Sequence, residues 1–314
     1  MLQQTQVATV IPYYLRFMAN LPELVDLAAA SGDQVLVLWS GLGYYRRARQ
    51  LHQAAKLCAE RHQGQLPNDP DALLALPGIG RSTAGAILAQ AWNRPYPILD
   101  GNVKRVLTRY HGIAGWPGHR KVEKKLWHLA EFHTPEHQAA DYTQAIMDLG
   151  ATVCGRQHPR CYDCPLRLTC YAYAHQRIDE FPEARPQRQR PTRQATLLVL
   201  RDQQGRILLE RRIQTGVWQG LWSLPQDTSI EPLRNLAQAH AKLEDCRQQN
   251  LPTIHHSFSH YHLQATPWLI DRVTAFSGVH ESDLCNWWTP QQAMDLALPA
   301  PIRKFLKQLK ENPN

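Results

Sequence analysis

The chain has 314 residues, of which 43% are hydrophobic and 20% are charged, and its formal net charge is +8. This length allows two domains with separate cores, and a basic balance favours a polyanionic partner such as nucleic acid. No run of eighteen apolar residues is present, and the first residues lack the basic and apolar regions of a secretory signal. We therefore expect a cytoplasmic protein without a membrane span.

Residues 1–150 carry the pattern of a mostly helical segment. Val10, Tyr13 and Phe17 recur at helical spacing, and the stretch 45–61 is rich in residues that favour helices. Asp69 can cap the next short helix, with Pro70 at its first position. The first half is therefore predicted to be all-α.

A glycine-rich turn separates two predicted helices within residues 76–88, which begin Leu76-Pro-Gly-Ile-Gly-Arg-Ser82. Because Gly78 and Gly80 lack side chains, backbone N–H groups can approach a phosphate there, and the next helix adds the partial positive charge of its N-terminus. The segment favours a helix–hairpin–helix contact with DNA. An ordinary turn between two helices is the structural alternative.

A carboxylate follows in the segment Pro97-Ile-Leu-Asp100-Gly-Asn102-Val-Lys104-Arg105. Asp100 can cap a helix over residues 102–110 and be held in a fixed orientation by doing so. Lys104 and Arg105 carry charges that can bind phosphate.

Four cysteines lie within seventeen residues, as Cys154-x6-Cys161-x2-Cys164-x5-Cys170. Clustered thiols in a cytosolic chain indicate a metal site rather than disulfides. Four thiolates suit a [4Fe–4S] cluster, with structural zinc as the alternative. The remaining cysteines at 58, 246 and 285 are expected to be buried structural thiols.

The second half changes character after a basic, proline-containing segment over residues 175–194, which we interpret as a linker. Apolar strands are predicted at 195–201 and 206–211, joined by a turn, and again at 254–264 and 266–274. Residues 301–310 form an amphipathic helix pattern. We expect a multidomain chain, with an all-α domain over 1–174, the linker, and an α+β domain over 195–314.

Four of these signatures occur in the order typical of one family: the turn at 76–88, Asp100, the cysteine loop 154–170 and the segment Gly216-Val-Trp-Gln-Gly-Leu-Trp-Ser-Leu-Pro225. Together they resemble the adenine DNA glycosylases, which are helix–hairpin–helix, iron–sulfur enzymes. The resemblance implies a Nudix-like C-terminal domain and a [4Fe–4S] cofactor. Its implied partner is double-stranded DNA with adenine opposite 8-oxoguanine or guanine. It further implies a monomeric bacterial protein that works in the cytoplasm, with the chromosome.

The resemblance also implies roles for individual residues. Asp100 would stabilise the positive charge that develops on the deoxyribose, and Asn102 would orient water or the aspartate. Contacts to DNA are implied for Gln4, Tyr44, Gly78, Gly80, Ser82, Lys104, Gln144, Phe258, Ser259 and His260. Among these, Tyr44 would wedge into the duplex with Gln4 filling the stack, and Gln144 would read the flipped adenine. Phe258, Ser259 and His260 would meet 8-oxoguanine.

Two departures from related patterns narrow the chemistry. Bifunctional glycosylases of this superfamily carry a lysine where this chain has Ser82, and a hydroxyl cannot form an imine, so we expect a monofunctional enzyme. Residues 226–250 lack the glutamate-rich pattern of Nudix hydrolases, which argues against nucleotide hydrolysis. Histidines at 256, 260 and 262 share one face of a predicted strand, but no carboxylate lies nearby in the sequence, so we do not expect a metal there.

The family's general acid is a glutamate in the pattern Ser-Glu-x-Met-Leu-Gln-Gln-Thr. This chain starts Met1-Leu-Gln-Gln-Thr5, so the glutamate would fall two residues before Met1, and no glutamate precedes Glu23. Either the chain is shortened or its start was assigned too late, or it is a product that binds DNA without efficient catalysis. We expect the chain as given to be nearly inactive. The functional alternatives are a non-catalytic mismatch-binding protein, an endonuclease III-like glycosylase/lyase and a Nudix hydrolase.

Overall fold

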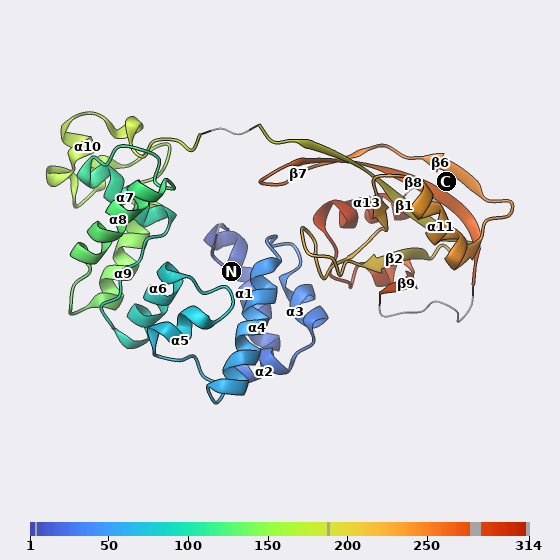
Figure 1. Cartoon of the computed structure of the whole chain (residues 1–314), viewed down its shortest axis with the longest axis horizontal. Helices are drawn as coiled ribbons and strands as arrows, with labels where there is room; N and C mark the ends of the chain where they lie inside the picture. The colour runs from blue at the N-terminus through green and yellow to red at the C-terminus, as the bar shows by residue number, and fades with distance from the viewer. Residues whose placement is uncertain (4, 187–188, 277–283, 312–314) are drawn as a thin grey trace. The chain divides into compact units, whose positions relative to one another are not determined.

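A computed structural model describes residues 1–3, 5–186, 189–276 and 284–311 (Figure 1). The chain divides into two compact units, one formed by Met1–Ala59 with Gln189–Asn314 and the other by Glu60–Arg188. In the described part of the chain, no helix is long and apolar enough to cross a membrane. The predicted domain boundaries at 174 and 195 are a different division and remain a prediction.

The unit over residues 60–188 is helical. Its elements are α5 (Pro70–Ala75), α6 (Arg81–Trp92), α7 (Gly101–His111), α8 (Arg120–His133), α9 (Ala139–Asp148), η1 (Leu149–Val153), η2 (Cys161–Asp163), η3 (Arg167–Thr169), α10 (Tyr171–Ala174) and η4 (Ile178–Glu180). Asp69 caps α5 by accepting a hydrogen bond from the Ala72 N–H, with Pro70 at the first position, as predicted. A core of Val103, Leu107 and Leu126 joins α7 to α8.

The other unit combines N-terminal helices with a mixed sheet. The helices are α1 (Val7–Asn20), α2 (Leu24–Ala29), α3 (Gly32–Trp39), α4 (Arg46–Arg61), α11 (Glu231–His240), α12 (Pro290–Ala293) and α13 (Ala300–Glu311). The strands are β1 (Thr192–Asp202), β2 (Ile207–Arg211), β3 (Trp222–Ser223), β4 (Gln226–Asp227), β5 (Ala241–Lys242), β6 (Arg247–Asn250), β7 (Ile254–Ser257), β8 (His262–Ala275) and β9 (Cys285–Trp288). The all-α and α+β expectations are therefore confirmed.

Strand β1 organises the sheet because both of its faces are buried. It runs parallel to β8 and antiparallel to β2, so the predicted hairpin over 195–211 is present. Leu197 and Val199 point into a core shared with Trp39 of α3, whereas Leu198 and Leu200 point into a second core under α11. This alternation is what a strand covered on both sides requires.

The predicted strand over 254–264 is wrong, because a turn interrupts it. β7 ends at Ser257, the Phe258 N–H donates to the Tyr261 carbonyl at 2.9 Å, and β8 begins at His262. The two strands form an antiparallel hairpin. The histidines at 256, 260 and 262 consequently do not share one strand face, because they lie in β7, in the turn and in β8, respectively.

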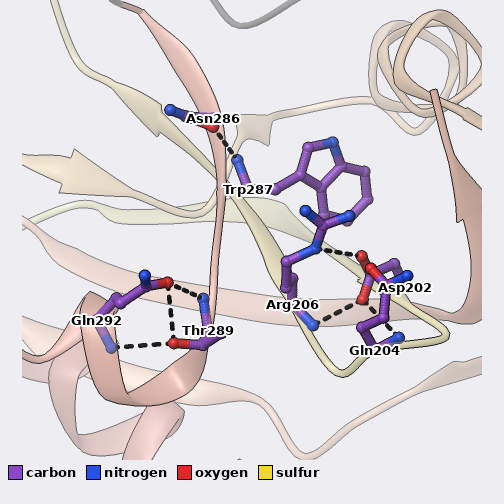
Figure 2. A network of polar contacts seen from close by, with 7 residues as sticks. All are labelled: Asp202, Gln204, Arg206, Asn286, Trp287, Thr289 and Gln292. Carbon is purple, nitrogen blue, oxygen red and sulfur yellow. Dashed lines mark hydrogen bonds and ion pairs between the residues drawn. The ribbon is translucent and has the colours of Figure 1, made fainter. Parts of the chain in front are cut away.

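Short-range polar contacts fix the β1–β2 turn and the start of α12 in this unit (Figure 2). In the β1–β2 turn, one Asp202 carboxylate oxygen accepts from the N–H groups of Gln204 and Arg206, and the other accepts from the Arg206 side chain. Thr289 caps α12 in a reciprocal contact with Gln292. Such contacts satisfy backbone donors that the sheet and helices leave free.

A largely buried ion pair joins the two parallel strands. Arg201 donates to both carboxylate oxygens of Asp271 at 2.6 and 2.7 Å, and both side chains are about 14% exposed or less. These hydrogen bonds lower the pKa of Asp271 below its ordinary value of 3.8.

We predict that Asp271→Asn lowers the free energy of unfolding at neutral pH by about 2 kcal/mol. Because the folded-state pKa is depressed, the contribution of Asp271 is present above pH 3.8 and is lost as pH falls through the folded-state value. Thermal melting from pH 7 to pH 2 should show the gap between the two proteins closing below about pH 4. Glu180→Gln, which removes an exposed pair with Arg177, is the control and should leave the melting temperature unchanged. A gap that persists at pH 2 would contradict the account.

Candidate active site and cysteine-lined pocket

The glycine turn leads into α6 and is tied to the segment before Asp100. Gly78 has a φ of +83°, which favours glycine, whereas Gly80 has a φ of −97° that any residue can adopt. The Ser82 hydroxyl accepts a hydrogen bond from the Leu99 N–H at 3.0 Å. A Cβ at Gly85 would collide with the Pro97 carbonyl, so glycine is what lets α6 approach this segment. The first turns of α6 therefore position the chain entering Asp100.

Asp100 is the N-cap of α7, as predicted. Its Oδ1 accepts from the Val103 N–H at 2.8 Å, and the side chain is half-buried. Gly150 of η1 approaches the start of the helix so closely that a Cβ there would lie 2.6 Å from the Cβ of Asn102. The carboxylate is thus held at a helix N-terminus that neighbouring backbone confines.

Asn102 and Arg105 connect this helix start to the cysteine loop. Arg105 donates to the Asn102 side-chain oxygen at 2.9 Å and to the Cys154 carbonyl at 2.7 Å, and it also bonds the Gly150 carbonyl. Arg105 was expected to bind phosphate, but these contacts turn its guanidinium inward.

The four clustered cysteines line one pocket, together with Arg109 and Arg167. Arg109 is 4% exposed and donates to the carbonyls of Gly155, Arg156 and Phe181, and its guanidinium lies 3.4 Å from the Cys154 sulfur. Burial and the neighbouring thiols raise the pKa of Cys161. Four thiolates would place several negative charges beside this one buried cation, which is the donor set and charge balance of an iron–sulfur cluster.

No group of three or more His, Cys, Asp or Glu side chains among the described residues is arranged to hold a metal ion as it stands. The four thiols nevertheless face a common space, so their chemistry and placement fit a cluster. The cysteines outside the loop differ: Cys58 is buried, as predicted, whereas Cys246 and Cys285 are only half-buried.

The other predicted DNA contacts of this unit lie on α7 and α9. Lys104 is paired with Glu123 at 2.6 Å, so its charge already has a partner. Gln144 is exposed on α9, donates to the Asp148 carboxylate and accepts from the Gln90 amide, each at 2.9 Å. The Gln144 amide is therefore held in one orientation at the surface.

The remaining predicted contacts lie in the other unit. Tyr44 has a left-handed backbone with a φ of +48°, and its side chain is 53% exposed with the Arg47 guanidinium 5.3 Å from its ring. Ser259 and His260 are exposed in the turn between β7 and β8, whereas Phe258 is half-buried. Gln4 lies outside the described residues.

Comparison with known proteins agrees with both halves of the chain. Residues 1–132 match the HhH-GPD superfamily of base excision DNA repair proteins, and residues 196–308 match the NUDIX domain. An adenine DNA glycosylase of Buchnera aphidicola subsp. Acyrthosiphon pisum is 35% identical over 313 residues, covering 99% of this chain and 89% of the relative. The chain belongs to the adenine DNA glycosylase family.

Two further comparisons are consistent with this assignment. The adenine DNA glycosylase of Mus musculus is 34% identical over 370 residues, covering 99% of this chain and 70% of the relative. The solved structure of a thermostable thymine-DNA glycosylase is 27% identical with a TM-score of 0.50, over 55% of this chain and 80% of the other. As a member of this family, the chain is a base excision DNA repair glycosylase, and its partner is DNA.

Sequence reasoning overlooked the structural importance of Arg109 and Trp218. Arg109 follows Arg105 by four residues, so both lie on one face of α7, and this spacing was a usable signal for a common partner. In the sequence, Trp218 stands out only as part of a family segment, although it is buried against the turn that carries Phe258. No local signal in the sequence pairs positions 218 and 258.

The cap at Asp100 generates a stability prediction. Asp100→Ala should lower the free energy of unfolding by about 1 kcal/mol, because the Val103 N–H loses its acceptor, whereas Asp100→Asn should cost almost nothing because asparagine caps equally well. Urea unfolding of the two variants measures the difference. Equal losses in both would mean that the carboxylate stabilises the fold by charge rather than by capping.

Proposed function

We propose that this glycosylase removes adenine mispaired with 8-oxoguanine or guanine, by hydrolysis of the N-glycosidic bond. The observation that carries the proposal is the Asp100 carboxylate, held at the N-terminus of α7 in a chain of the adenine DNA glycosylase family. Breaking this bond develops positive charge on the deoxyribose, and a preorganised carboxylate stabilises that charge. The product would be an abasic site.

The two carboxylate oxygens of Asp100 can have different roles. Oδ1 accepts the Val103 N–H and fixes the orientation of the group. No hydrogen bond to Oδ2 is present among the described residues, so this oxygen is available to the sugar or to an attacking water. Asn102 follows two residues later, and its amide oxygen is fixed by Arg105. We propose that the Asn102 amide group orients water beside the carboxylate.

Ser82 supports a monofunctional reaction. A Schiff base needs an amine, and the Ser82 hydroxyl has none; it also accepts the Leu99 N–H. Water is therefore the proposed nucleophile, and strand cleavage by lyase chemistry is not proposed.

DNA recognition is assigned to residues of both units. We propose backbone phosphate contacts at Gly78, Gly80, Ser82 and Lys104, insertion of Tyr44 and Gln4 into the base stack, and adenine contacts by Gln144. In the other unit, the turn with Phe258, Ser259 and His260 would meet 8-oxoguanine. Exposure of Ser259 and His260 supports this assignment, since both polar side chains lie at the surface, where the Ser259 hydroxyl and the His260 Nδ1 contact one another at 3.3 Å.

The proposed cofactor is a [4Fe–4S] cluster held by Cys154, Cys161, Cys164 and Cys170. When bound, it would tie together the loop 154–170 beside α7. Arg109 would offset part of its negative charge, and Arg105 would fix the first ligand through the Cys154 carbonyl. These arginines act on the loop from α7, the helix that Asp100 caps.

We predict that Cys164→Ser reduces the iron content well below the roughly four atoms per chain of a complete cluster, with loss of its visible absorbance. Cys246→Ser, a half-buried cysteine outside the loop, is the matched control and should retain full iron. Stoichiometric zinc with no iron in the unaltered protein would instead establish the alternative metal.

The general acid sets the expected rate. Adenine leaves readily only when a ring nitrogen is protonated, and general acid catalysis contributes about 10²–10⁴-fold. The family places a glutamate in the pattern Ser-Glu-x-Met ahead of Leu2, and residues 1–22 contain no glutamate. We propose that fast adenine release requires a segment that carries this glutamate.

Single-turnover adenine release from a duplex with 8-oxoguanine opposite adenine tests the function. We compare residues 1–314 with a form extended upstream through Ser-Glu-x, and expect the extended form to be faster by about 10²-fold or more. Asp100→Asn in the extended form should lose most of this activity while keeping its helix cap. Tight binding without release by the extended form would favour the mismatch-binding candidate. Equal rates for both lengths would show that another residue supplies the proton.

A further inference from the structure

Two proposed DNA contacts of one compact unit, the Tyr44 wedge and the turn over 258–260 that would read the lesion, lie on either side of a single loop. We call them the two lesion-reading devices. Tyr44 precedes α4, and the reading turn over 258–260 follows β7. The loop over residues 216–220, between β2 and β3, contacts elements next to both. This inference rests on the proposed function and concerns how the two devices are held relative to one another.

The backbone of this loop is tightly constrained. Gly216, Trp218 and Gly220 all have left-handed φ values, of 140°, 64° and 82°. A bulky residue such as tryptophan rarely adopts this conformation unless its surroundings hold it there. Hydrogen bonds from the Gly220 N–H to the Arg212 carbonyl and from the Leu221 N–H to the Trp218 carbonyl close the loop.

On one side, Trp218 supports the reading turn. Its buried indole lies 5.2 Å from the Phe258 ring and 5.9 Å from the His256 ring, measured between centroids. Phe258 in turn packs against Tyr261 at 4.6 Å. This aromatic cluster holds one end of the turn, while Ser259 and His260 stay exposed.

On its other side, the loop is clamped to α4. The Arg49 guanidinium donates to the Gln219 carbonyl at 2.5 Å and to its side-chain oxygen at 3.0 Å. Arg49 lies in the first turn of α4, close behind Tyr44, and its N–H donates to the Tyr45 carbonyl. Gly220 also lets the loop lie close to α3, since a Cβ there would lie 3.1 Å from Leu36. Burial lowers the pKa of Arg49, as expected for a guanidinium withdrawn from water.

We infer that the loop 216–220 is a positioning element, and that Arg49, Gln219 and Trp218 set the spacing between the Tyr44 wedge and the reading turn. A base opposite adenine must meet both devices at once to be recognised as 8-oxoguanine. Loosening the loop should therefore reduce the preference for 8-oxoguanine over guanine, rather than overall affinity for DNA. None of the three residues needs to touch the lesion for this effect.

The test measures dissociation constants for two duplexes, with 8-oxoguanine or guanine opposite a non-cleavable 2′-fluoro adenine nucleotide. Binding is the readout, so the result does not depend on the rate of catalysis. Arg49→Ala should reduce the preference for 8-oxoguanine by about tenfold, the size of one charge-assisted hydrogen bond. Gln219→Ala, which keeps the carbonyl contact, should have a smaller effect. The double variant should resemble Arg49→Ala, because the two side chains act through one contact.

Arg46→Ala is the matched control. Arg46 is exposed on the same helix, so its removal deletes one positive charge without touching the loop. It should weaken binding to both duplexes equally, as loss of a phosphate contact does. Trp218→Ala tests the other side of the loop and should reproduce the loss of preference, with circular dichroism to verify folding. Arg49→Lys should restore it only in part.

The outcomes separate this inference from the proposed function. If the unaltered chain shows no preference for 8-oxoguanine, the proposed lesion specificity fails and the inference falls with it. If the unaltered chain shows the preference and Arg49→Ala and Gln219→Ala both retain it, only the positioning role is overturned. Equal weakening of both duplexes by Arg49→Ala would show that Arg49 binds phosphate and does not position the loop.

Discussion

The cap of α7 by Asp100 is the interaction on which the candidate active site depends. The side chain that must face a developing cation is fixed by a backbone donor of its own helix, the Val103 N–H. Two contacts at the backbone level confine the same point: the Leu99 N–H is bound by Ser82, and Gly150 lies against Asn102. A carboxylate placed by backbone geometry needs little reorganisation when charge develops beside it, which is the basis of electrostatic preorganisation.

The same helix extends this order to the cysteine loop. Arg105 and Arg109 lie on one face of α7, and both bind carbonyls of the loop, so fixed cations hold the loop in addition to the apolar packing of Cys154 and Leu166. The loop has little regular secondary structure, so its backbone carbonyls would otherwise have to accept hydrogen bonds from water. The proposed cluster would thus add a covalent tie to a segment that α7 already organises. Disorder in the loop would first remove the loop carbonyls that Arg105 binds. Because Arg105 also binds the Asn102 side chain, the start of α7 would then lose order as well.

Features that depend on residues close together in the sequence could be predicted, whereas features that depend on distant residues could not. The caps at Asp69 and Asp100, the hairpin over 195–211 and the helix at the C-terminal end follow from spacing and turn chemistry within a few residues, and all were predicted. The break of the 254–264 strand was not, because alternation of residue types continues through the turn. The sharing of one core by residues 1–59 and 189–314 was not foreseen either. An apolar helix face in the sequence indicates that another segment packs against it, but does not indicate which distant segment this is.

The formal net charge likewise predicts the class of partner but not which cations contact it. A net charge of +8 correctly favoured nucleic acid, but the formal count treats every cation as available to phosphate. In the structure, Arg105, Arg109 and Arg201 are engaged internally. Each such cation is already compensated or desolvated, so it adds little to the counterion release that drives DNA binding. The salt dependence of binding should consequently reflect the exposed arginines, such as Arg46. The buried arginines serve the same function indirectly, by holding the groups that do the chemistry.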